Sequence, residues 1–235
     1  MPRPIQLTGY KLTRDEFDAV VRGYCRVTLH PRARRAMQRS RALIEKFIAE
    51  KSVVYGVTTG VGSLSTEHID PHEARAMQLN LIRSHACGIG DPLGAAETRG
   101  ILLLRANALA TGLSGVRPVV AEALCDLLNH AIHPVVPERG SVGASGDLAP
   151  LAHVALALVG EGEVTVRAKG LQSSAAKRMP ARTALARAGL KPLTLEAKEG
   201  LALMNGTQVM QSLGLLALRK VEILADTADV AGALS

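Results

Sequence analysis

The sequence is poor in aromatic residues: three Tyr, two Phe and no Trp make up only 2% of its 235 residues. A core with so few rings must be built from Ala, Leu and Val, which favours packed helices over a β-sandwich or barrel. The same scarcity argues against a nucleic acid partner, because single strands are bound by stacking bases on aromatic rings. We therefore expect a mainly α-helical fold.

Cysteine is scarce as well. Cys25, Cys87 and Cys125 are odd in number, far apart and without CxxC spacing, which indicates neither a disulfide framework nor a zinc site. The N-terminus has no apolar signal core, and no unbroken apolar run reaches the roughly 18 residues that a spanning helix needs. We expect a cytoplasmic protein with no metal and no membrane partner.

Charge is unevenly distributed. The chain has 28 Lys and Arg against 21 Asp and Glu, and the excess lies within residues 1–54. Its densest stretch, from Arg32 to Arg41, alternates with apolar residues as an amphipathic helix does. This pattern favours a solvated helix face over a site for a polyanion.

Helical patterns cover most of the chain. A capping threonine, Thr13, opens the first helix, and Gly189 is placed to end a later one. Residues 52–54 begin like a short strand, and a hairpin of 161–166 with residues around Leu171 is the one convincing β signal. The predicted helices are 13–27, 31–51, 71–84, 95–111, 118–131, 148–159, 180–188, 195–204 and 208–234.

The last predicted helix is still apolar where the sequence stops. A domain rarely ends halfway along an apolar helix, so we expect the chain to be the front part of something longer. We divide it into a helical head domain, residues 1–205, and the truncated start of a long-helix bundle, residues 206–235.

Three glycine-rich loops, at residues 52–65, 84–92 and 141–147, lie at helix junctions, where function often resides. In the third, Ala144-Ser145-Gly146 has a plain interpretation as a tight turn with Asp147 capping the next helix. A GxSxG esterase elbow does not fit, because Asp147 stands where the second glycine belongs. No glycine-rich phosphate motif occurs.

Ala-Ser-Gly can also cyclise. The Gly146 nitrogen attacks the Ala144 carbonyl, the Ser145 hydroxyl leaves as water, and two waters are lost in all. Glycine suits the attacking position because a Cβ would obstruct its approach. The product, a 4-methylidene-imidazol-5-one, is an electrophile that no ordinary side chain supplies.

With its neighbouring loops, this segment resembles the ammonia-lyases and aminomutases of aromatic amino acids, above all the histidine-specific ones. The resemblance runs from about Leu7 to the end of the chain. Four segments carry it in family order: Tyr55-Gly-Val-Thr-Thr-Gly-Val-Gly, Asn80-Leu-Ile-Arg-Ser-His-Ala-Cys-Gly-Ile-Gly, Gly143-Ala-Ser-Gly-Asp-Leu-Ala-Pro-Leu-Ala-His153 and Lys198-Glu-Gly-Leu-Ala-Leu-Met-Asn-Gly-Thr-Gln208.

The resemblance implies a role for each matching residue. Tyr55 is the catalytic acid or base near the substrate β-carbon, on a loop that Gly60 and Gly62 keep able to fold over the site. His85 reads the substrate ring, and Asn205 helps hold the prosthetic group or the substrate. The group itself forms from Ala144, Ser145 and Gly146, and Asp147 takes part in that cyclisation. For His153 we expect a structural hydrogen bond.

The implied reaction is non-oxidative deamination of L-histidine to trans-urocanate and ammonia, with no diffusible cofactor. Members of the family are about twice this long and form homotetramers, so the resemblance also implies a missing C-terminal half. Two alternatives stay open: a non-catalytic truncated fragment, and a tyrosine or phenylalanine ammonia-lyase or aminomutase of the same family.

Overall fold

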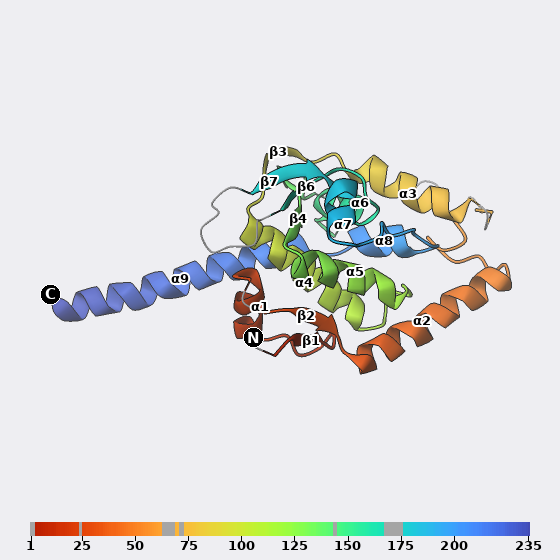
Figure 1. The fold of residues 1–235 in the computed structure, drawn as a ribbon. Helices are drawn as coiled ribbons and strands as arrows, with labels where there is room; N and C mark the ends of the chain where they lie inside the picture. Colours follow the sequence, from red (N-terminus) through yellow and green to blue (C-terminus); the bar gives the residue numbers. More distant parts are fainter. Residues whose placement is uncertain (1–2, 24, 63–68, 71–72, 143–144, 167–175) are drawn as a thin grey trace.

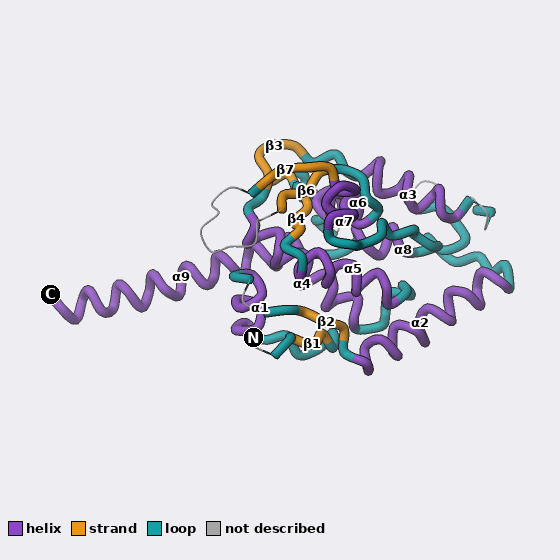
Figure 2. Tube along the Cα trace, in the orientation of Figure 1, coloured by secondary structure: helices purple, strands orange, loops and turns teal. Residues whose placement is uncertain are grey.

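The computed structural model describes residues 3–23, 25–62, 69–70, 73–142, 145–166 and 176–235. Within them the fold is mainly helical, as expected (Figures 1 and 2). The helices are α1 (Arg14–Val21), α2 (Pro31–Ala49), α3 (Ala74–His85), α4 (Ala95–Ala110), α5 (Pro118–Asn129), α6 (Leu148–Leu158), α7 (Ala181–Arg187), α8 (Glu199–Met204) and α9 (Gln208–Leu234).

Short strands form three small sheets, more β structure than the sequence predicts. Parallel β1 (Ile5–Leu7) and β2 (Val27–Leu29) pair near the N-terminus, and β3 (Ile89–Pro92) pairs antiparallel with β5 (Pro137–Arg139). The third sheet has the antiparallel order β4 (Ile132–Pro134), β6 (Glu163–Val166), β7 (Lys177–Pro180).

The first helix is shorter than predicted. Thr13 does form a capping box with Glu16, but α1 ends at Val21, and Gly23 turns the chain with a φ of +80°. Val27 then starts β2, because its backbone pairs with Ile5 of β1. This contact is non-local, and helical periodicity could not reveal it.

The predicted hairpin is present, with a later second strand. Glu163 of β6 pairs with Pro180 of β7, and β4 adds a third strand on the other side of β6. The residues around Leu171 lie outside the described part of the chain. The short strand expected at 52–54 is wrong, since that segment leads into a turn at 55–58.

The arginine-rich helix α2 has the solvated face that its pattern predicts, with one exception. Arg32, Arg35 and Arg39 are exposed, whereas Arg41 is only 7% exposed. Arg41 Nη1 donates to the Ala197 carbonyl at 2.9 Å, so this side chain joins α2 to the segment before α8.

The core is built on α4, which packs against α1, α5 and α9 (Figure 1). Only the first turns of α9 take part: its buried residues are Gln208, Val209 and Ser212. Further along, Arg219 and Glu222 form ion pairs with Asp18 and Arg14 of α1, and beyond them the helix projects from the body. The stretch Glu199–Leu234 is long and apolar enough to cross a membrane by composition, a test that core helices of soluble proteins also pass.

Candidate active site

The loop before α6 carries the serine of the cyclising triplet. Ser145 is half-buried and Gly146 is buried, while Ala144 lies outside the described residues. Gly146 has a φ of +83°, a left-handed conformation that side chains rarely adopt, and a Cβ there would lie 2.7 Å from Met210 Cε. The backbone at Gly146 therefore requires glycine for a reason independent of any reaction.

Asp147 does not cap α6, contrary to the sequence expectation. Its side chain makes no cap bond to that helix and is fully buried. Asp147 Oδ2 instead accepts from the backbone N–H groups of Val209 at 2.8 Å and Met210 at 3.1 Å, and Oδ1 accepts from Ser141 Oγ at 3.0 Å. Asp147 thus caps α9 and ties the serine loop to it.

Tyr55 stands on the first glycine-rich loop and is 53% exposed. Its hydroxyl accepts from the Gly62 N–H at 3.1 Å, which leaves the phenolic proton outside that bond. The next residue, Gly56, has a φ of +65°, and a Cβ there would lie 2.7 Å from Leu201 Cδ2. The Tyr55 loop is therefore pressed against α8.

His85 is the last residue of α3. Its Nδ1 lies 2.9 Å from the Leu81 carbonyl and 3.1 Å from Ser84 Oγ. A carbonyl can only accept, so the bond to Leu81 places the proton on Nδ1. The neutral ring then offers Nε2 as a hydrogen-bond acceptor.

Asn205 ends α8 and is exposed, with its backbone N–H donating to the Leu201 carbonyl at 2.9 Å. Three residues later α9 begins. Asn205 therefore lies in the turn between two helices, close in sequence to the backbone groups that Asp147 binds.

Two polar side chains, the buried Gln78 and the half-buried His153, connect α3 and the loop after it to α8 and α6. Gln78 is fully buried, and its Oε1 accepts from the Gly200 N–H at 2.7 Å. His153 Nε2 accepts from the Gly88 N–H at 3.2 Å, which confirms the structural hydrogen bond expected for it. Burial lowers the pKa of His153, in keeping with a neutral acceptor.

The segments that carry Tyr55, His85, Ser145 and Asn205 thus contact one another through α3, α6 and α8. Among the described residues, no hydrogen bond links these four side chains directly. The sequence analysis did not single out Gln78, although it is a polar residue on the apolar face of α3. It also missed the buried Arg105, a charge within an apolar run of α4.

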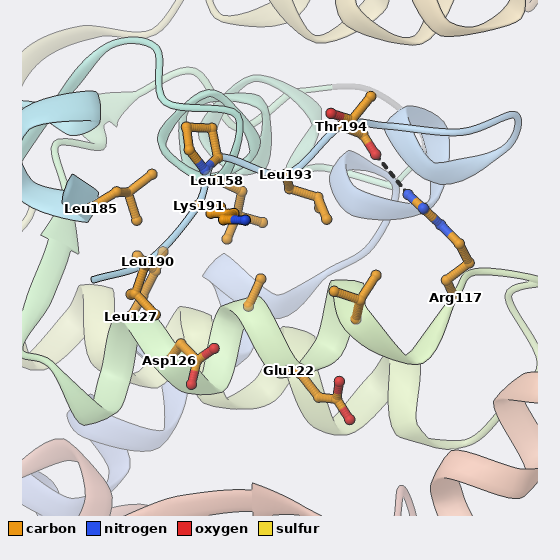
Figure 3. Close-up of a pocket in the computed structure, with 13 residues that line it drawn as sticks. Arg117, Glu122, Asp126, Leu127, Leu158, Leu185, Leu190, Lys191, Leu193 and Thr194 are labelled. Atoms are coloured by element: carbon orange, nitrogen blue, oxygen red, sulfur yellow. Dashed lines mark hydrogen bonds between the residues drawn. The ribbon is translucent and has the colours of Figure 1, made fainter. Parts of the chain in front are cut away.

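One cavity in the described part of the chain lies away from these residues. It has a volume of about 350 Å³ and lies between α5 and residues 190–194 (Figure 3). Leucines line it together with Glu122, Asp126 and Lys191, and none of the site residues above does. No group of three or more potential metal ligands occurs in the described segments.

Comparison with known proteins gives the class of the chain, a lyase by family. Residues 12–235 match the family described as aromatic amino acid lyase, and the chain belongs to that family.

Several individual members of this family are similar to the chain. Histidine ammonia-lyase of Koribacter versatilis is 52% identical over 233 residues, which are 99% of this chain and 44% of that protein. The chain therefore spans less than half the length of this curated relative. Among solved structures, histidine ammonia-lyase of Trypanosoma cruzi superposes with a TM-score of 0.85 at 36% identity, covering 97% of this chain and 42% of that one. Tyrosine aminomutase of Streptomyces globisporus gives 0.80 and 38%, covering 91% and 38%.

Proposed function

We propose that the chain is the front part of a histidine ammonia-lyase, which converts L-histidine to trans-urocanate and ammonia. The observation that carries this proposal is the Asp147 anchor, which holds the loop of Ser145 and Gly146 on the first turn of α9, next to the turn of Asn205. The 52% identity to a histidine ammonia-lyase over nearly the whole chain supports the substrate.

The residues at this loop fit a 4-methylidene-imidazol-5-one. It would form from Ala144, Ser145 and Gly146 by bonding of the Gly146 nitrogen to the Ala144 carbonyl carbon, with loss of two waters, and a glycine without a Cβ favours that approach. The group supplies an electrophile that withdraws electron density from the substrate, so that a weakly acidic β-proton can be removed. Asp147 holds the loop in place on the N-terminus of α9.

His85 favours a substrate whose ring carries a hydrogen-bond donor. The bond from Nδ1 to Leu81 leaves Nε2 as an acceptor, which fits an imidazole N–H or a phenol O–H. A phenyl ring has no such donor and would leave Nε2 unpaired. His85 thus supports histidine or tyrosine over phenylalanine.

Tyr55 is assigned the proton transfer at the β-carbon. Its hydroxyl oxygen is oriented by the Gly62 N–H, while the phenolic proton stays outside that bond. Asn205, on the turn between α8 and α9, is assigned to hold the prosthetic group or the substrate by its amide.

The exposed part of α9 supports an assembly. Beyond its first turns, α9 exposes large apolar side chains, and we propose that a C-terminal half or other subunits of a homotetramer cover them. A division into a head of residues 1–205 and the start of a bundle at 206–235 is part of this proposal. The three free cysteines fit a cytoplasmic location. The exposed apolar residues are Leu218, Val221, Ile223, Leu224, Val230 and Leu234.

The test is urocanate formation from L-histidine by the full-length protein, followed by ultraviolet absorbance, beside a Ser145→Ala variant. We expect activity in the wild type and a loss of about 10³-fold or more in the variant, because the variant cannot form the electrophile. Equal rates in the two proteins would refute the proposal.

A second candidate is a tyrosine aminomutase, favoured by the superposition on that enzyme. Incubation of the full-length protein with L-tyrosine, followed by chromatographic separation of the amino acid products, separates the two. Turnover of tyrosine to its β-isomer, with histidine inert, would replace the first candidate by the second.

A further inference from the structure

Arg105 is an arginine in the interior of the protein, on the middle of α4. Its side chain is only 4% exposed. Among the described residues no carboxylate pairs with it, and its Nε has no hydrogen-bond partner. Burial lowers the pKa of Arg105 to about 10, so the group is still a cation near neutral pH. A charge buried at this cost calls for an explanation.

The two terminal nitrogens of Arg105 reach both sides of one turn. Nη1 donates to Gln208 Oε1 at 2.6 Å, and Nη2 donates to the Ala202 carbonyl. Ala202 lies in α8 and Gln208 is the first residue of α9. Asn205 lies between these two contacts in the sequence.

Gly206, next to Asn205, is packed tightly against this arrangement. A Cβ on Gly206 would lie 2.3 Å from Arg105 Nη1 and 2.1 Å from Gln208 Oε1. Both atoms are held by the hydrogen bond between them. The turn therefore approaches the guanidinium as closely as a residue without a side chain allows.

Asp147 holds the next part of the chain from the serine loop, through Val209 and Met210. Arg105 thus fixes the Asn205 turn on both sides, through Ala202 before it and Gln208 after it. Asp147 fixes the residues that follow Gln208.

We propose that Arg105 is a positioning residue that sets the Asn205 turn relative to the Ser145 loop. It acts on the reaction through Asn205 and Gln208 and touches no reacting atom itself. The catalytic part of this inference rests on the proposed function. The structural part, that Arg105 immobilises residues 205–208, stands without it.

The chain offers a matched control on the same helix. Arg99 is also buried, at 7% exposed, and burial also lowers its pKa. Its Nε donates to the Val20 carbonyl at 2.8 Å and its Nη1 to the Leu128 carbonyl at 3.2 Å, away from α8 and α9. Replacing Arg99 removes a similar buried cation without touching the turn.

The experiment compares Arg105→Met with Arg99→Met in the full-length protein, with two readouts. The first is hydrogen exchange of the backbone amides of residues 205–208, which needs no activity. We expect about tenfold or faster exchange in Arg105→Met and unchanged exchange in Arg99→Met, since local opening governs exchange. Equal exchange at this turn in both variants would overturn the structural part.

The second readout is kcat and KM for L-histidine. We expect kcat of Arg105→Met to fall about 10- to 100-fold with little change in KM, because a displacement of about 1 Å costs that much. A kcat unchanged, or lowered equally by Arg99→Met, would overturn the positioning role. Absence of activity in the wild type itself would refute the proposed function instead.

A second variant covers the case in which Arg105→Met does not fold. Gly206→Ala leaves the arginine in place but puts a methyl group where Nη1 and Gln208 Oε1 meet. We expect it to accelerate exchange at residues 205–208 and to lower kcat as Arg105→Met does. Wild-type exchange in a folded Gly206→Ala variant would count against the account.

Discussion

The first turns of α9 and the remainder of the same helix share an apolar composition but differ in every contact. Val209 and Ser212 are buried, the N-terminal N–H groups bind Asp147, and Ser212 Oγ donates to the Glu97 carbonyl at 2.9 Å. Further along, Leu224 is 69% exposed and Leu234 is 84% exposed. An apolar sequence thus predicts that a helix will be buried, but the elements that lie next to it in the fold decide which of its residues are.

The largest effect is expected where the serine loop meets α9. Asp147→Ala removes the acceptor for two backbone N–H groups, one buried and one partly buried, so we expect the free energy of unfolding to fall by about 3 kcal/mol. Urea unfolding measures it. Asp229→Ala, on the exposed part of α9, is the control and should change nothing. A loss below about 1 kcal/mol for Asp147→Ala would show that this anchor is weak.

The packing of α4 on α9 gives the next effect. A Cβ at Gly100 would lie 2.1 Å from Ser212 Oγ and 2.9 Å from the Phe17 ring, so Gly100→Ala should destabilise by about 1–3 kcal/mol.

Its matched control is Gly214→Ala, six residues into α9, where a Cβ meets nothing within 4 Å. Removing a glycine from a helix interior should stabilise by about 0.5–1 kcal/mol. Thermal unfolding should show a lower midpoint than wild type for Gly100→Ala and a higher midpoint for Gly214→Ala. Shifts in the same direction would contradict the contrast between buried and exposed contacts.

A smaller effect concerns pH. His153 accepts the Gly88 N–H only as a neutral ring, and burial lowers its pKa from the ordinary 6.5. Its contribution to stability is therefore complete above pH 6.5 and is lost as the pH falls below 6.5 through the lowered pKa. Urea unfolding from pH 8 to pH 5 should show a steeper loss for the wild type than for His153→Gln. Parallel curves would mean that His153 carries no such linkage.

The smallest effect on this chain is expected on the exposed part of α9. Leu224→Lys should change the free energy of unfolding of the chain alone by less than about 0.5 kcal/mol. In the full-length protein the same change should weaken assembly, because it places a charge on the apolar face. Light scattering of the two full-length proteins checks this. An unchanged assembly would place Leu224 outside any interface.

Much of the helical fold was predictable because its signals are local. The capping box at Thr13, the glycine after α7 and the helical pattern of α9 all follow from neighbouring residues in the sequence. The strands β1 and β2 were missed because each has three residues and exists through pairing with the other.

The candidate site was predictable to the level of its loops and not of their contacts. The sequence places Asp147 before α6 and so predicts a cap there, but its partners are Val209 and Met210, about sixty residues away. Arg41 shows the same limit, since the helical pattern places it on the solvated face and its partner Ala197 takes it into the interior. Long-range hydrogen bonds decide where the side chains of Asp147 and Arg41 lie.

The central claim is that Ala144, Ser145 and Gly146 form the electrophile of a lyase. The intact mass of the full-length protein tests it most directly, beside Ser145→Ala. The account predicts that the wild type is lighter than its sequence by two water molecules and that the variant has its full sequence mass. A folded wild-type protein with its full sequence mass would contradict it.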